Sequence, residues 1–373
     1  MGKDQTKVRR IDELDLLRGF FVLTILVDHL QRWPSPFLFV TGEGRLWASA
    51  AEGFFIISGL LIGYVRGYKD RHKPFKGVAV KLLKRAALLY VWSIIITLIV
   101  VALTKWLPIQ DVSLIPKYPD GVAATSFWHF IGAVLTQGYV SDWIYFLRLY
   151  WMMLVAAIPV VWLLRHRQAW LVVIISIGLY VLTELAFELP EGALQWQILF
   201  FLPAVLGYYL EPLMVWMRRH TTVWRATTLA LASSTIATIL LSFYWVHGWS
   251  LSITLAHMNL AKYEDVRERI DPWFASSPLE PGRVVFGLFW FLGGLALFML
   301  LRRPLTKYFG WLLFTYGRAS LSAYCIQAIL LCFIQAFVPL STSPYYNFTL
   351  TVAVLMAVWG LLRVEHVRKL LPT

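Results

Sequence analysis

The sequence is poor in charged residues and in cysteine. Asp, Glu, Lys and Arg make up 15% of its 373 residues, whereas soluble globular domains contain about 25%. Hydrophobic residues make up 59%, which excludes an ordinary soluble domain and predicts an integral membrane protein. The two cysteines, Cys325 and Cys332, lie in one apolar segment. Their spacing on a helix is about 10.5 Å, too long for a disulfide, so both are expected to be packing residues.

Acidic residues are scarce relative to basic ones. The chain has 21 Asp and Glu residues against 34 Lys and Arg residues, giving a net charge of +13. In a soluble domain this excess would indicate nucleic-acid binding. In a membrane protein it indicates that positive charge holds the cytoplasmic loops on the inner side. We therefore expect the lipid bilayer as a partner and no nucleic acid.

The apolar segments predict an all-α, polytopic membrane protein with about ten transmembrane helices. An N-in, C-in orientation places most Lys and Arg residues in inner segments. Residues 1–373 would form a single transmembrane domain, with a cytoplasmic tail at 1–13 and an outer loop at about 247–282. Segment 126–140 is apolar but short and is expected to be interfacial or re-entrant. The predicted spans are 14–31, 46–65, 86–107, 143–164, 168–187, 194–217, 225–246, 283–301, 312–338 and 347–362.

The first predicted span, LDLLRGFFVLTILVDHL, carries polar residues near both ends. Arg18 and His29 are separated by about three helical turns, so they lie on nearly the same helix face, about 16.5 Å apart along the axis. Arg18 would lie near the cytoplasmic interface and His29 near the outer end. Asp28 points about 100° away from His29, so it is expected to cap the helix or contact another span. A snorkelling Arg18 and a hydrated His29 are the structural alternatives.

The second predicted span lies in SAAEGFFIISGLLIGYV and begins with a carboxylate among apolar residues. A charge inside a membrane is costly and therefore indicates function. Glu52 is expected near the depth of His29, where a carboxylate would fix the imidazole tautomer and raise its basicity. Ser58 lies about two turns deeper, where small residues let helices or a thin ligand approach closely.

These motifs carry a resemblance to a known family. LDLLRGF…DH followed by EGFFIISGLLIG resembles the start of the acyltransferase-3 superfamily. Three later stretches, FLRLYWMMLVAAIPVVWLLR, LQWQILFFLPAVLGYYL and YGRASLSAYCIQAILL, resemble the OpgC family of membrane glucan acyltransferases. The resemblance implies ten core spans, an acyl-CoA donor at the cytoplasmic face and an acceptor glycan outside. It also implies that His29 is the general base and that Arg18 serves the donor or the structure.

The sequence departs from the superfamily pattern at two places. Where the superfamily has a second basic motif, R-x-x-R, the stretch VKLLKRAALLY offers Lys81 and Lys84, with Arg85 adjacent. Lysines bind phosphate as point charges but lack the bidentate fork of arginine. Plain positive-inside topology also accounts for these residues, so their role towards the donor stays open. The late motif, which often ends in His, ends here in Gln327.

Two residues are candidates for substrate contacts near the outer face. Arg148 lies about one turn into the fourth predicted span. It could pair with an acyl carboxylate or a sugar, or form a structural ion pair. Trp33 belongs to a group of aromatic residues at the outer interface, which fits either an aromatic belt or sugar stacking. No metal site is predicted.

Together these residues and the resemblance imply a multi-pass O-acyltransferase of the bacterial plasma (inner) membrane. Acyl transfer from a thioester to a hydroxyl needs a base for the hydroxyl proton and a stabiliser for the oxyanion, and a histidine supplies the first. The enzyme would move an acetyl- or succinyl-type group from cytoplasmic acyl-CoA to an extracytoplasmic glycan. The alternative is a transporter or flippase of a lipid-linked or small acylated substrate, with the intramembrane Arg, His and Glu lining its path. Homo-oligomerisation is left open.

Overall fold

The computed structural model describes residues 11–108, 126–185, 191–251 and 259–371. Within these ranges the backbone is helical, apart from short connections and one isolated β-bridge between Ser276 and Leu279. The all-α class is therefore confirmed. The long helices are α1 (Asp12–Leu30), α3 (Ala50–Leu61), α4 (Phe75–Trp106), α6 (Tyr145–Arg165), α7 (Ala169–Leu185), α9 (Ile198–Arg219), α10 (Thr221–His247), α11 (Leu260–Ile270), α12 (Pro281–Leu300), α15 (Ser320–Phe337) and α16 (Pro344–Arg363).

Shorter helical elements connect or extend these helices. The short α-helices are α2 (Leu38–Thr41), α5 (Phe127–Leu135), α8 (Glu191–Trp196), α13 (Arg302–Pro304), α14 (Gly310–Arg318) and α17 (Glu365–Leu370). Short 3₁₀ helices within the described ranges include η1 (Gly42–Gly44), η4 (Asp142–Ile144) and η5 (Asp271–Phe274). Two π-helical stretches, η2 (Ile62–Lys69) and η6 (Leu305–Phe309), continue α3 and precede α14.

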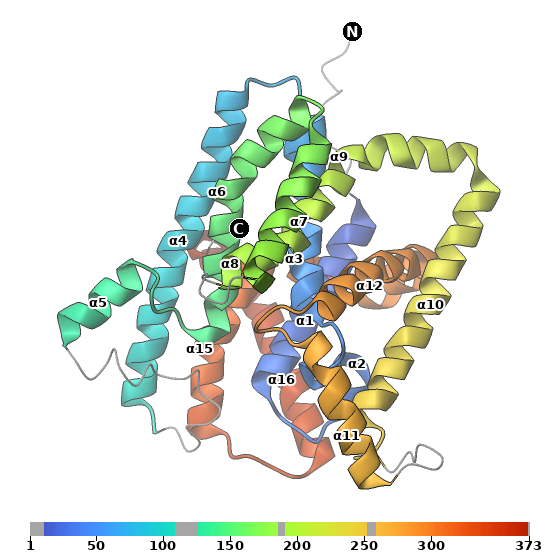
Figure 1. Cartoon of the computed structure of the whole chain (residues 1–373). Coiled ribbons are helices and arrows are strands. Elements are labelled where there is room, and N and C mark those ends of the chain that lie inside the picture. The colour runs from blue at the N-terminus through green and yellow to red at the C-terminus, as the bar shows by residue number, and fades with distance from the viewer. Residues whose placement is uncertain (1–10, 109–125, 186–190, 252–258, 372–373) are drawn as a thin grey trace.

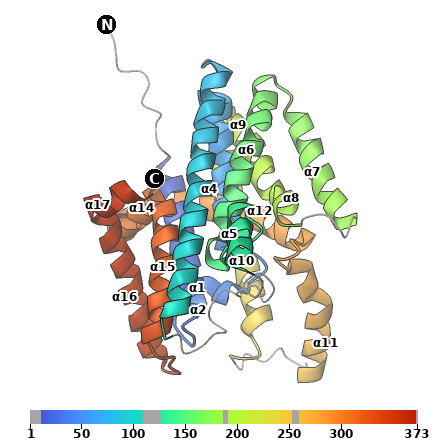
Figure 2. The same ribbon diagram turned by 90° about the vertical axis from the view of Figure 1, so that its left-hand side faces the viewer.

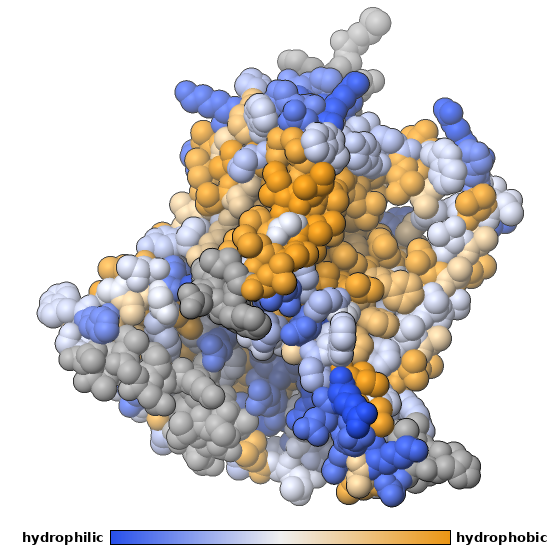
Figure 3. All heavy atoms as spheres, in the orientation of Figure 1, coloured by the Kyte–Doolittle hydropathy of each residue, from blue (hydrophilic) through white to orange (hydrophobic). Residues whose placement is uncertain are grey.

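The helices have the lengths and surface that a membrane requires. Among the described residues, eight helical stretches are long and apolar enough to cross a bilayer, by length and composition. The other two predicted spans correspond to α1, with 19 residues, and α7, with 17 residues. Figure 3 shows apolar residues gathered across the middle of one face, with hydrophilic residues above and below them. The chain is therefore a polytopic membrane protein, and the count of ten crossings stays a prediction.

Helix α1 lies inside the bundle, where it packs against α3, α12, α14 and α15 (Figure 1). Glycine allows the closest of these approaches, because a Cβ at Gly19 would overlap the carbonyl group of Leu313 in α14. The glycine of the FFIISG motif acts in the same way, since a Cβ at Gly59 would overlap the carbonyl group of Phe200 in α9. Small residues at helix interfaces are typical of membrane bundles. Gly59 therefore serves helix packing.

One predicted span is interrupted. Segment 312–338 contains the end of α14 and all of α15, which are separated at Ala319, where the backbone leaves helical geometry (φ −117°, ψ 34°). The last carbonyls of a helix lack intrahelical donors. One of these carbonyls, that of Gly317, accepts a hydrogen bond from Nη1 of Arg18 at 3.3 Å. Both sides of the break are apolar, so the hydropathy pattern does not reveal it.

Two further segments were expected to lie outside the spans. Segment 126–140 contains α5, whose nine residues measure about 13.5 Å and are too short to cross a bilayer. The predicted outer loop contains α11 and η5, joined to the end of α10 by a hydrogen bond from Trp245 Nε1 to Asp271 at 3.1 Å. Residues 252–258 of this loop lie outside the described part.

The helices end at different levels on the side where α1 begins. Figure 2 shows the first turns of α4 standing above α14 and α17. Helix α4 has 32 residues and measures about 48 Å, so it is longer than a hydrocarbon core of about 30 Å. Part of α4 therefore projects beyond α14 and α17 at this end.

Candidate active site

One face of α1 carries Arg18, His29 and part of a narrow cavity. Val22 and Ile25 line this cavity. With Arg18 and His29 they form an i, i+4, i+7, i+11 series, which is one stripe along a helix. The cavity has a volume of about 20 Å³ and an entirely apolar lining. The remaining lining residues are Phe54 of α3, Phe146, Leu147 and Tyr150 of α6, and Leu321 and Tyr324 of α15.

His29 is half-buried at the C-terminal end of this stripe, the end predicted to face outward, and contacts α15. Its Nδ1 atom lies 3.1 Å from Nε2 of Gln327. Its ring centroid lies 6.2 Å from that of Tyr324. Among the described residues, no hydrogen bond is made by Nε2 of His29. The imidazole is therefore held through one nitrogen, and the other nitrogen is left for a further partner.

Unmatched polar atoms gather around His29. Gln327 is 1% exposed, and its Oε1 atom is buried without a hydrogen-bond partner. The hydroxyl of Tyr324 is buried and lacks a well-formed hydrogen bond, although the backbone amide of Phe146 approaches it. Buried polar groups are normally satisfied, so such exceptions need an explanation. Binding of a polar ligand group would provide one for the Tyr324 hydroxyl, whereas a half-turn of the Gln327 amide would pair its Oε1 atom with Nδ1–H of His29.

Asp28 points away from His29, as the helical geometry predicts. Its carboxylate lies near Gly44 and interacts with the side chain of Thr41, in the segment that follows α1. The Oδ1 atom of Asp28 is buried without a hydrogen-bond partner. Asp28 and His29 are thus neighbours in sequence but face different surfaces of α1.

Arg18 lies at the N-terminal end of the same stripe, the end predicted to face the cytoplasm. Besides its bond to Gly317, its Nη1 atom lies 3.8 Å from Oδ1 of Asp15. Arg18 therefore stabilises the end of α14, and its side chain remains 18% exposed. These contacts are consistent with the structural alternative for Arg18, and its role towards a donor stays a prediction.

Glu52 pairs with Arg283 and not with His29, so the expected pairing is wrong. Its Oε1 atom accepts a hydrogen bond from Nε of Arg283 at 2.6 Å. Its Oε2 atom accepts two hydrogen bonds from Ser49, from the backbone amide and the hydroxyl, each at 2.7 Å. Ser49 and Glu52 form the capping box of α3. The sequence suggests this box as S-x-x-E, but it gives no sign that Arg283 is the counter-ion.

Ser58 occupies the position expected from the sequence but has a local partner. Its hydroxyl donates to the backbone carbonyl of Phe54 at 2.8 Å, one turn earlier in α3. Phe54 lines the cavity, whereas Ser58 does not. A donor contact from Ser58 would require this intrahelical bond to change.

Three basic candidates lie in the first third of α4, and all are exposed: Lys81, Lys84 and Arg85. The guanidinium carbon of Arg85 lies 6.0 Å from the ring centroid of Tyr150. Tyr150 lines the cavity on α1, so Arg85 is the member of this group that the structure connects to the cavity. Both lysines remain predictions for donor binding.

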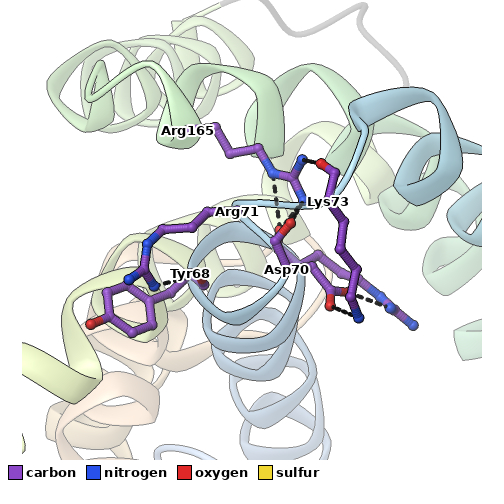
Figure 4. Close-up of polar contacts among 6 residues, drawn as sticks. Tyr68, Asp70, Arg71, Lys73 and Arg165 are labelled. Carbon is purple, nitrogen blue, oxygen red and sulfur yellow. Dashed lines mark hydrogen bonds and ion pairs between the residues drawn. The ribbon is translucent and has the colours of Figure 1, made fainter. Parts of the chain in front are cut away.

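The loop before α4 is held by a buried carboxylate, Asp70, and more exposed basic residues around it. Figure 4 shows Lys73 and Arg165 converging on Asp70. The carboxylate of Asp70 accepts from Nζ of Lys73 at 2.6 Å and from Arg66 at 2.8 Å, and its backbone carbonyl accepts from Arg165 at 2.6 Å. Burial raises the pKa of Asp70, but the hydrogen bonds from Lys73 and Arg66 outweigh it and hold the pKa below its usual value. Lys73 thus fixes the loop.

The two candidates predicted for the outer face make no hydrogen bond or ring contact with His29 in the described part of the structure. Arg148 is half-buried on α6, and its guanidinium carbon lies 5.9 Å from the ring centroid of Tyr145. Trp33 is half-buried and packs against the core after the end of α1. Substrate contacts by either residue remain predictions.

Sequence reasoning missed a buried arginine beside Trp33. Arg32 is 2% exposed and donates to the carbonyls of Ile334, Val338 and Pro339 and to Oε1 of Gln335. Arg32 thus ties the end of α1 to the end of α15. An arginine next to an interfacial tryptophan is typical of a snorkelling residue, so the sequence carries no sign of this burial.

The described residues contain no group of three His, Cys, Asp or Glu side chains that could hold a metal ion. The fold and this site define an all-α polytopic membrane protein with a polar histidine site at one end of an intramembrane apolar cavity. The family model described as OpgC protein matches residues 9–367, so the chain belongs to the OpgC family. No curated protein and no solved structure matches the chain. Membership of this family implies an acyltransferase-type activity in a membrane.

Proposed function

We propose that the protein transfers an acetyl- or succinyl-type group from cytoplasmic acyl-CoA to a hydroxyl of an extracytoplasmic glycan. The observation that carries this proposal is the apolar cavity on α1, which lies between Arg18 and His29 on one helix face. A thin, mostly apolar donor arm could follow this stripe while the donor phosphates stay at the inner end. Arg18 and Arg85 are the candidate phosphate contacts, with Lys81 and Lys84 as further cations on α4.

The reaction needs one base and a route for one proton. The acceptor hydroxyl oxygen attacks the thioester carbonyl, the carbon–sulfur bond breaks, and His29 takes the hydroxyl proton and returns it to the departing thiolate. His29 must therefore present an unprotonated nitrogen to the acceptor. Because Nδ1 faces Gln327, the base would be Nε2.

Gln327 would then be a positioning residue. The oxygen and nitrogen of a glutamine amide can exchange places by a half-turn about its last torsion. With Oε1 turned towards His29, Gln327 accepts a hydrogen bond from Nδ1–H and leaves the lone pair of Nε2 free. Tyr324 lines the cavity, and its hydroxyl lacks a well-formed hydrogen bond. This hydroxyl is the candidate donor of a hydrogen bond to the thioester oxyanion.

The cavity must widen when the donor binds. A volume of about 20 Å³ corresponds to about one water molecule. Phe54 and Tyr324 line it from two different helices, α3 and α15, and are the side chains whose rotation would open it. Donor binding should therefore be slower than for a preformed pocket.

The test is turnover by the purified protein. Release of free CoA from acetyl-CoA and succinyl-CoA is measured with glucan acceptors, and acylated product is identified by mass spectrometry. His29→Ala should lose about 10²–10⁴-fold in turnover and keep donor binding. His29→Gln should do little better, because an amide cannot take the proton. The matched control is His72→Ala, which removes an exposed histidine from the loop before α4. Near-parental turnover by His29→Ala would refute the assignment of the base.

A further inference from the structure

A large cleft lies beside the inner end of α1, on the surface formed by η6, α14 and the end of α16. Its volume is about 790 Å³. It shares no lining residue with the apolar cavity near His29. The lining residues are Thr306, Gly310, Trp311, Phe314, Thr315, Arg318, Ala319, Leu362 and Arg363.

Two arginines give this cleft its charge. Arg318 stacks its guanidinium over the ring of Phe314 at 4.7 Å, and Arg363 lies over the ring of Trp359 at 4.9 Å. Neither guanidinium donates a hydrogen bond to a described residue, and the described lining contains no carboxylate. The nearest acid is Asp15, whose Oδ2 atom lies 3.9 Å from Nε of Arg318. The cleft therefore presents two aromatic-supported cations, of which Arg318 makes one long ion pair through Nε and Arg363 makes no ion pair with a described residue.

The rim of the cleft has the composition of a membrane interface. Tyr308, Phe309 and Trp311 are each at least half exposed, at 60%, 54% and 50%. Exposed aromatic residues of this kind sit at the depth of lipid headgroups. The same helical run is fixed to the start of α1 by Arg302, which pairs with Asp12 and Glu13 at 3.0 Å. The cleft thus faces the headgroup layer on the side where α1 begins.

We propose that this cleft binds the phosphate of an anionic phospholipid. The planar guanidinium groups of Arg318 and Arg363 match phosphate oxygens and can each bind them through two hydrogen bonds. The apolar side chains of Trp311, Phe314 and Leu362 would contact the glycerol and the first methylenes. The phosphates of a CoA donor have similar chemistry, but the exposed aromatic rim of Tyr308, Phe309 and Trp311, which suits the depth of lipid headgroups, favours lipid.

The experiment measures lipid binding to the delipidated, full-length protein by native mass spectrometry, with phosphatidylglycerol and phosphatidylcholine as the two probes. Arg318→Ala/Arg363→Ala should bind phosphatidylglycerol about tenfold more weakly than the parent. The matched control is Arg219→Ala/Arg303→Ala, which removes two exposed arginines outside the cleft and should bind like the parent. All variants are first shown to be monodisperse and to melt like the parent.

Two further measurements distinguish binding of a lipid phosphate from binding of the coenzyme A phosphates. Thr315→Phe keeps both arginines but fills the cleft, so it should also weaken phosphatidylglycerol binding. Coenzyme A is titrated into the same proteins and should bind the double variant as it binds the parent. The proposal is overturned if the double variant keeps parental phosphatidylglycerol binding, or if the parent binds phosphatidylcholine equally well. It is also overturned if coenzyme A binding is lost while phosphatidylglycerol binding is unchanged, because the cleft would then serve the donor.

Discussion

Removing the charge of Glu52 should destabilise the fold rather than disable a catalytic pair. Glu52 is 0% exposed, Arg283 is 7% exposed, and their side chains are joined at 2.6 Å. In Glu52→Gln the amide can keep its bonds to Ser49, but its NH₂ group would face Nε of Arg283. A buried arginine would then lack a counter-ion, and breaking a buried pair in this way costs about 3–5 kcal/mol.

The loss of stability in Glu52→Gln should be largely reversed when the charge of Arg283 is also removed. Glu52→Gln/Arg283→Met leaves neither charge and retains an apolar side chain of similar length. It also loses the hydrogen bond from Arg283 to the carbonyl of Phe274, worth about 1 kcal/mol. The double variant should therefore lie within about 1–2 kcal/mol of the parent, so the two substitutions should be strongly non-additive.

Thermal unfolding in detergent measures these differences. Cys325 and Cys332 are both free and buried, so a thiol-reactive fluorophore reports their exposure on unfolding. Glu52→Gln should melt about 6–10 °C below the parent, on the basis of about 2 °C per kcal/mol for a chain of this size. If Glu52→Gln melts within about 1 °C of the parent while its turnover collapses, the structural assignment is refuted and Glu52 returns to catalysis.

Two other predictions test the inner face and the orientation. Because the folded-state pKa of Asp70 lies below its ordinary value, its contribution to stability should be present above about pH 4 and lost as the pH falls through the folded-state value. Asp70→Asn should thus melt below the parent at pH 7, and the gap should close on acidification. For the orientation, a cysteine at Ser276 should react with an impermeant thiol reagent added to intact cells, and one at Lys76 should not; the reverse labelling pattern would invert the topology and place His29 on the wrong side.

The sequence was sufficient for the fold class and for the stripe on α1, because both depend on local periodicity. Apolar segments of about 20 residues predict spans directly. The eleven-residue spacing between Arg18 and His29 predicts a shared helix face from geometry alone. The cavity then occupies the positions between them, at Val22 and Ile25.

The partners of these residues could not be predicted in the same way. Gln327 is 298 residues from His29, and Arg283 is 231 residues from Glu52, so no local pattern connects either pair. Glu52 and His29 were expected to pair because they share a depth in the membrane. Depth does not specify direction around a helix axis, and the capping box of α3 turns the carboxylate of Glu52 towards α12 instead.

The interruption at Ala319 connects these observations. It ends α14 beside α1, where the carbonyl of Gly317 accepts a hydrogen bond from Arg18. It also starts a new helix, α15, which carries Tyr324 and Gln327 to His29. An uninterrupted 312–338 helix would continue in the direction of α14 and could not make both contacts. The break therefore lets one segment of the chain bind both polar ends of α1, and this explains why irregular backbone is found here, buried in protein, within an otherwise helical membrane bundle.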